Sequence, residues 1–207
     1  MVAEFPTSVD FRTLQFGNTP NTTIFKSPTN RAVQSFELPG GQWYGTWEVR
    51  RSSLEDIAKW KAFLTDLSGP SGRFHGTDPS QITPFGIYSS GSDTPLVDGA
   101  AQTGKSLITK GWRLSGTGLL LAGDLFEITI SSVKRLYMVT AQVDSDGSGD
   151  ATISITPPLI DSPADNLALV LTSPKVEMQL VDDNQSLWDV PTNRLVTGFT
   201  FSGIEVI

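Results

Sequence analysis

The stretch from 42 to 50 has the clearest alternation of apolar and polar positions in the chain. It places Trp43, Trp47 and Val49 on one face, and polar side chains such as Glu48 on the other. An alternation with a period of two residues is typical of a strand that is buried on one side. We therefore predict a half-buried strand here and treat it as the centre of the fold.

A helix is predicted directly after this strand. The segment 52–55 offers serine hydroxyls and a glutamate, which together can satisfy the first N–H groups of a helix. Apolar residues follow at helical spacing, and Gly69 with Pro70 ends the pattern. With the two phenylalanines of the last strand, the apolar residues of both elements form our set of candidates for the core or for subunit contacts: Trp43, Trp47, Ile57, Trp60, Leu64, Phe199 and Phe201.

Residues 1–30 look extended and irregular, with turn chemistry at 17–21. A strand is predicted over 31–38, and Pro39-Gly40-Gly41 reads as a tight turn that joins it to the central strand as a hairpin.

From about 96 to 171 the pattern consists of short strands only, and it predicts a small closed β-barrel of the oligonucleotide/oligosaccharide-binding (OB) type. The stretch 89–95 reads as a linker, and a strand over 196–207 is expected to pair back with the first sheet. We therefore predict a mainly β (α+β) chain with two domains. Residues 1–94 and 172–207 form one discontinuous domain, a β-sandwich with one flanking helix, and residues 95–171 form an inserted barrel.

Composition narrows the range of functions. The 207 residues contain no cysteine, which excludes a disulfide scaffold and a thiolate metal site. The net charge of -7 argues against a surface that coats nucleic acid, because phosphates must be met by excess Lys and Arg. No apolar run approaches the roughly 20 residues of a membrane span. The N-terminus lacks the features of a secretory signal.

Two loops resemble ligand-binding motifs. Residues 99–106 match the phosphate-loop pattern G-x-x-x-x-G-K-S, but that motif needs a helix after it, and the residues here are strand-like. We predict a turn before a strand, with a nucleotide-binding enzyme acting through Lys105 as a remote alternative. The loop 144–150 has carboxylates at alternate positions, but Ile155 stands where a calcium loop has its closing glutamate. We predict a hairpin loop there.

No catalytic constellation is found, and we predict neither an enzyme nor a bound cofactor or metal. His75 is the single histidine, and no nucleophile or orienting carboxylate lies at a spacing from it that would indicate catalysis.

Aromatic side chains can also stack on sugars. A carbohydrate-binding module that contacts host surface sugars through Trp112 or Tyr137 of the barrel is therefore the alternative function.

Several short stretches, in a consistent order along most of the chain, together resemble the distal tail proteins of siphophages that infect proteobacteria. They are Trp47-Glu48-Val49, 57–64, Leu67-Ser68-Gly69, 98–104, Gly111-Trp112, 121–124, Arg135-Leu136-Tyr137, Ala151-Thr152-Ile153, Pro157-Pro158-Leu159, Pro163-Ala164-Asp165 and 198–201.

The resemblance implies a structural virion protein that forms a homohexameric ring between the tail tube and the tail-tip or baseplate hub. It implies a tail-tube-like β domain with one helix and an OB-like domain on the outside. Expected partners are other copies of the chain, the tail tube protein and the tail-tip hub protein, with the tape-measure protein or side fibres as further possibilities. DNA would pass through the lumen without specific binding, and the protein would be assembled in the host cytoplasm away from membranes. Lys105 departs from the family pattern, and we interpret it as chance.

Overall fold

The computed structural model describes residues 2–6, 11–50, 54–187 and 199–207. Strands dominate these ranges, around a single α-helix and two short 3-10 turns, so the predicted mainly β class is confirmed. No helix among the described residues is long and apolar enough to cross a membrane.

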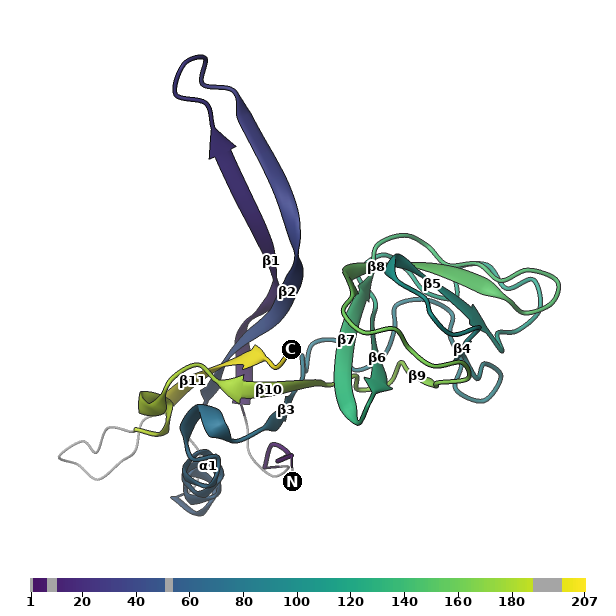
Figure 1. Cartoon of the computed structure of the whole chain (residues 1–207). Helices are drawn as coiled ribbons and strands as arrows, with labels where there is room; N and C mark the ends of the chain where they lie inside the picture. Colours follow the sequence, from purple (N-terminus) through teal and green to yellow (C-terminus); the bar gives the residue numbers. More distant parts are fainter. Residues whose placement is uncertain (1, 7–10, 51–53, 188–198) are drawn as a thin grey trace.

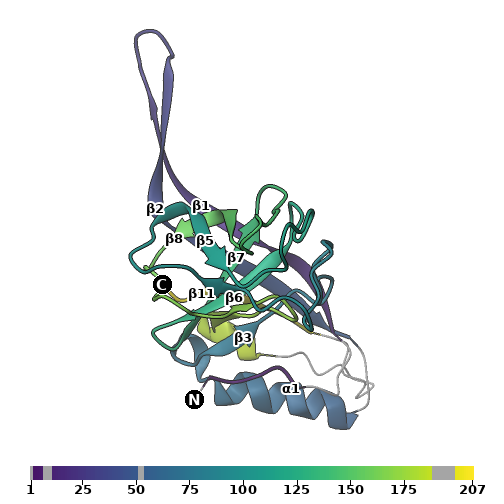
Figure 2. The same ribbon diagram turned by 90° about the vertical axis from the view of Figure 1, so that its right-hand side faces the viewer.

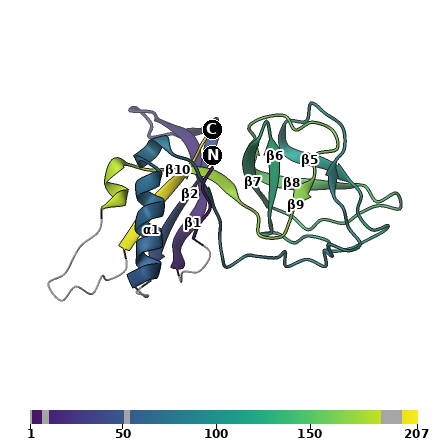
Figure 3. The same cartoon turned by 90° about the horizontal axis from the view of Figure 1, so that it is seen from below.

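The first sheet is antiparallel and has five strands in the order β1-β2-β11-β10-β3. Helix α1 (Leu54–Asp66) lies across one face of it (Figure 3). A 3-10 turn over Gly69–Ser71 follows the helix, and a second one spans Asp183–Ser186. The strands are β1 (Phe11–Lys26), β2 (Val33–Val49), β3 (Phe74–Gly76), β10 (Val176–Leu180) and β11 (Phe199–Glu205).

The second sheet has six strands in the order β4-β5-β8-β7-β6-β9 and curls into a nearly closed barrel. Its ends meet through a bridge between Leu96 and Ala168 and through a hydrogen bond from the Val97 amide to the Leu167 carbonyl (2.8 Å). All its strands lie inside the range 95–171: β4 (Leu96–Val97), β5 (Gly104–Lys110), β6 (Leu125–Ile130), β7 (Val133–Val139), β8 (Ala151–Leu159) and β9 (Leu169–Val170).

Aromatic rings form the core between the first sheet and α1. The alternation along β2 turns Trp47 toward the helix, where its ring stacks on Phe201 with centroids 5.5 Å apart. Trp60 reaches the same ring from α1, and Phe5 lies against both tryptophans. Gly45 leaves the space for Trp47, because a Cβ at residue 45 would come within 2.3 Å of the indole.

The predicted turn at Pro39-Gly40-Gly41 is wrong. Strand β2 runs straight through these residues, and the chain reverses instead at 27–32, where the Ser27 amide donates to the Ala32 carbonyl (2.9 Å). The register of β1 against β2 shifts between Thr19 and Asn21, opposite this Pro-Gly-Gly segment. The segment therefore forms a bulge, with φ of 98° at Gly40, and a bulge tolerates both proline and a positive φ.

A buried ionic joint connects the two sheets. Glu205 of β11 accepts a hydrogen bond from the Trp43 amide (3.0 Å) and pairs with Arg135 of β7 (3.4 Å). Arg135 also donates to the Val206 carbonyl, and the Trp43 indole N–H donates to the Leu136 carbonyl (2.7 Å). Burial raises the pKa of Glu205, against the opposing effects of the Trp43 amide and Arg135. These contacts fix the barrel against the first sheet at β2 and at the end of β11.

Candidate self-association surface

The distal half of the β1–β2 hairpin is a free arm. We define the arm as residues 19–39, which are exposed apart from the half-buried Ser27. In Figures 1 and 2 its tip projects beyond the other strands of the first sheet, the barrel and α1. A two-stranded ribbon on its own is marginally stable in water. An arm of this length therefore indicates a surface that is completed by a partner.

The arm carries large apolar side chains that are exposed to solvent. On the face shared by Phe25, Phe36 and Leu38, the exposed fractions are 59%, 61% and 44%. On the opposite face, Ile24 and Val33 are each 59% exposed. Scattered single apolar residues are ordinary on a protein surface, but a concentration on one projecting element marks an interaction site.

The arm is also basic within an acidic chain. Between residues 11 and 36 there is no carboxylate, and the tip of the arm carries Lys26 and Arg31. Neither cation has a carboxylate partner among the described residues. The whole chain has a net charge of -7. Because the arm is basic, the rest of the chain carries a net charge more negative than this. The arm and the body of the molecule are thus complementary in charge.

The two edges of the first sheet differ. Beyond β3, Ala3 forms a parallel bridge with Phe74 and exchanges backbone hydrogen bonds with Arg73 (2.8 Å) and His75 (2.9 Å). On the other side β1 pairs with β2 alone, so within the described ranges its outer edge offers unpaired N–H and C=O groups. Such an edge is a template for pairing with another chain.

An apolar crevice lies at the root of the arm, where the bulge of β2 meets the end of β8. It encloses a volume of about 260 Å³, less than the roughly 300–1,000 Å³ of a typical small-molecule pocket. The lining residues are Pro39, Gly40, Gly41, Pro158, Leu159, Ile160 and Ile207. Beside it, Lys105 of β5 pairs with Glu37 of the arm (2.6 Å), so the arm is tied to the barrel at its base.

The predicted core residues are buried inside the chain. Trp43, Trp47, Trp60, Leu64 and Phe201 belong to one apolar cluster, Ile57 is buried as well, and Phe199 packs against the cluster half-buried. As core candidates they are placed as expected. They are not available as subunit contacts, because α1 and the first sheet already cover them.

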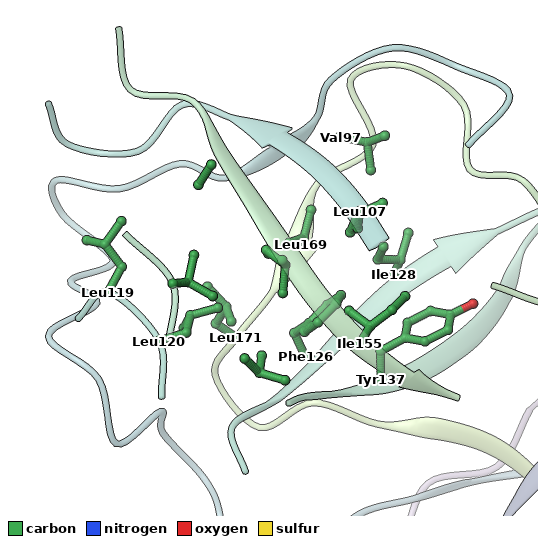
Figure 4. Packing of buried hydrophobic residues seen from close by; sticks show 14 of the residues in the cluster. Val97, Leu107, Leu119, Leu120, Phe126, Ile128, Tyr137, Ile155, Leu169 and Leu171 are labelled. Atoms are coloured by element: carbon green, nitrogen blue, oxygen red, sulfur yellow. The ribbon is translucent and has the colours of Figure 1, made fainter. Parts of the chain in front are cut away.

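The barrel aromatics proposed to face a sugar are also buried, and that prediction is corrected. Trp112 is 4% exposed and donates its indole N–H to the Thr109 hydroxyl (2.9 Å). Tyr137 is 1% exposed and points into the barrel beside Phe126 and Ile155 (Figure 4). Burial raises the pKa of Tyr137 to about 12. Stacking on a sugar needs an open ring face, which neither side chain presents.

The two motif-like loops have structural roles. Residues 104–110 form strand β5, so Lys105 lies at the start of a strand and not of a helix. This is the strand that the sequence predicted. In the loop 144–150, Asp146 accepts hydrogen bonds from the amides of Ser148 (2.8 Å) and Asp150 (2.9 Å) and so shapes the turn itself.

His75 contacts Glu4, with 2.6 Å between Nδ1 and Oε1. No group of three or more potential metal ligands occurs within the described ranges.

Two buried carboxylates hold the segment 81–93 against the barrel. Asp124 accepts hydrogen bonds from the amides of Phe85 (2.7 Å) and Leu121 (2.7 Å). Asp93 accepts from the Ser89 amide (2.9 Å) and from the guanidinium of Arg113 (2.6 Å). The burial of these two residues could not be predicted, because a single carboxylate in a polar stretch carries no local signal of burial.

We predict that Asp93→Asn lowers stability at pH 7 by about 1–2 kcal/mol, because the charge-assisted hydrogen bonds that Asp93 accepts become neutral ones and Arg113 is partly solvated. Burial alone would raise the pKa of Asp93, but the hydrogen bonds from Arg113 and Ser89 bring it below the usual value. The folded-state pKa is thus below the unfolded one, so this stabilisation is present above about pH 4 and lost as pH falls through the folded-state value.

Urea unfolding at pH 7 and pH 3 checks this prediction. The loss of stability on acidification should be smaller in Asp93→Asn than in the parent chain. The exposed control Asp150→Asn should keep the parent's pH dependence. An unchanged pH dependence in Asp93→Asn would show that the pair contributes nothing to acid sensitivity.

In comparisons with known proteins, no family model and no curated protein matches the chain.

Proposed function

We propose that this chain is a structural assembly protein that forms a homohexameric ring, and that the ring joins a phage tail tube to the tail-tip hub. The observation that carries the proposal is the free arm, a basic and partly apolar ribbon that the other described residues of its chain leave exposed. The unpaired outer edge of β1 supports it, because a ring of such subunits can continue one sheet into the next.

The sheet face opposite α1 suits a channel for DNA. It is lined by hydroxyl groups such as those of Thr46 and Ser202, which lie 3.0 Å apart, with Tyr44 beside them. Arg12 on this face is paired with Glu48. Non-specific DNA binding depends on cations that neutralise phosphates, so a hydroxyl face with its arginine already paired allows DNA to slide without adhering. The tail tube protein and the tail-tip hub protein are the partners expected on the two rims.

The mass of the purified protein in solution tests the proposal. Light scattering after size exclusion is expected to give a discrete species of six times the chain mass of 22.4 kDa, and electron micrographs should show rings. A monomer at high concentration that also fails to bind tail tube protein would overturn it. An open series of larger species would favour a filament over a closed ring.

A further inference from the structure

The crevice at the root of the arm is built for one apolar side chain. It is bounded by the Pro-Gly-Gly bulge of β2 on one side and by the end of β8 on the other. Gly41 lies beside the barrel, because a Cβ there would be in ordinary van der Waals contact with Pro157 at 3.7 Å. A volume of about 260 Å³ is small for a cofactor, but it is several times the roughly 30 Å³ that one water takes up in the liquid.

The arm cannot place its own Phe25 in the crevice at its root. Leu38 pairs with Asn21 next to the bulge, whereas Phe25 pairs with Gln34 four residues further out. At roughly 3.4 Å per residue, Phe25 lies about 14 Å beyond Leu38 along a straight ribbon. Phe25 can therefore enter such a crevice only in another molecule.

We propose that the apolar face of one copy's arm docks at the root of the arm of a second copy, with Phe25 entering the crevice. This inference rests on the proposed function and names the contact that closes the ring. Charge favours a second copy as the occupant. The basic tip with Lys26 and Arg31 would approach Asp161 and Glu37, which pair with Arg135 and Lys105 of their own chain but whose side chains are still 55% and 47% exposed.

The size of the arm also fits this role. Roughly 20 residues project from the body, and a standard protein–protein interface uses about 20–30 residues on each side. The Glu37–Lys105 pair adds a contact between the base of the arm and the barrel. The element that donates Phe25 and the crevice that receives it are therefore held in a fixed relation within each copy, as a head-to-tail ring requires.

Cysteine cross-linking tests the contact directly, because the chain has no cysteine of its own. Phe25→Cys and Ile207→Cys are made in separate full-length chains, mixed and oxidised mildly. Ile207 lines the crevice and is 52% exposed, so its replacement should leave the fold intact. A disulfide needs Cα atoms within about 7 Å, so a band of two chains on a non-reducing gel is expected only if residue 25 of one copy enters the crevice of another.

Ile24→Cys is the matched control, because residue 24 is equally exposed but faces the opposite side of the arm. It should cross-link to residue 207 at least tenfold less. If the protein assembles but gives no band between residues 25 and 207, or gives equal bands for both probes, this inference is overturned. The ring proposal is unaffected by that result. A protein that stays monomeric overturns both.

Phe25→Ala gives a second readout without cross-linking. It should raise the concentration at half-assembly about 30-fold, the effect of losing a contact worth about 2 kcal/mol, whereas Ile24→Ala should change it less than threefold. Equal effects of the two substitutions would contradict a docking role for the Phe25 face.

Discussion

Replacing residues 22–37 by Asn-Gly is expected to yield a folded monomer. The two-residue turn joins Asn21 to Leu38, which are paired in the parent hairpin, so the register, the bulge and the crevice are kept. The deleted part contains Ile24, Phe25, Val33 and Phe36 of the arm, and none of these packs against either core cluster. Loss of several apolar contacts at an interface typically weakens association by more than about 4 kcal/mol, which is on the order of 1,000-fold.

Light scattering over a wide concentration range and thermal unfolding together measure this outcome. The shortened chain should elute as a monomer with near-parental secondary structure. A second variant keeps the length of the arm and replaces Phe25, Phe36 and Leu38 by threonine, a residue that favours strands. It should also be monomeric if the apolar face is what associates. A shortened chain that assembles like the parent would rule out the arm as the self-association surface.

Trp47→Ala is expected to lower the free energy of unfolding of the first domain by about 3–5 kcal/mol. Trp47 is fully buried and stacks on Phe201, and its indole N–H donates to the Thr77 carbonyl (3.2 Å). Phe5 and Phe74 contact it edge-on with centroids 5.4 and 6.0 Å away. Because whole domains are stable by only about 5–15 kcal/mol, this one truncation removes a large part of the total.

Gly45→Ala provides the matched control in a double-mutant cycle under urea. In the parent chain the added methyl group would collide with the Trp47 ring, so a loss of at least about 1–3 kcal/mol is expected. In the Trp47→Ala background the ring is gone, and the same change should cost much less. Additive losses would show that Trp47 does not occupy the space above Gly45, and a loss below about 1 kcal/mol for Trp47→Ala would contradict its central place in the core.

Local periodicity predicted most of the fold. The short strands expected over 96–171 are present as β4 to β9, and the alternation around Trp47 identified its buried face correctly. These elements are half-buried, so their sequence reports directly which side faces the core. Tyr137 and Val139 are two residues apart and therefore share one face of β7, and both are buried, so this alternation is a local signal against a ligand-facing role for Tyr137.

The arm could not be recognised in the same way. Its residues touch no core, so nothing forces apolar and polar positions to alternate according to burial. Turn-forming residues at 17–21 and 39–41 are tolerated because they lie beside a register shift in an exposed ribbon. The available signal was electrostatic: an uninterrupted stretch without carboxylates between residues 11 and 36 in an otherwise acidic chain.

The joint between Glu205 and Arg135 has a mechanical consequence. Both side chains are buried, so tilting the barrel away from the first sheet would separate two charges out of contact with water, at a cost of several kcal/mol. Glu205 also holds the Trp43 amide of β2, the strand that continues outward as half of the arm. In the proposed ring, a force that pulls on the barrel would therefore be transmitted along β2 to the contact with the next subunit, rather than being absorbed by a hinge.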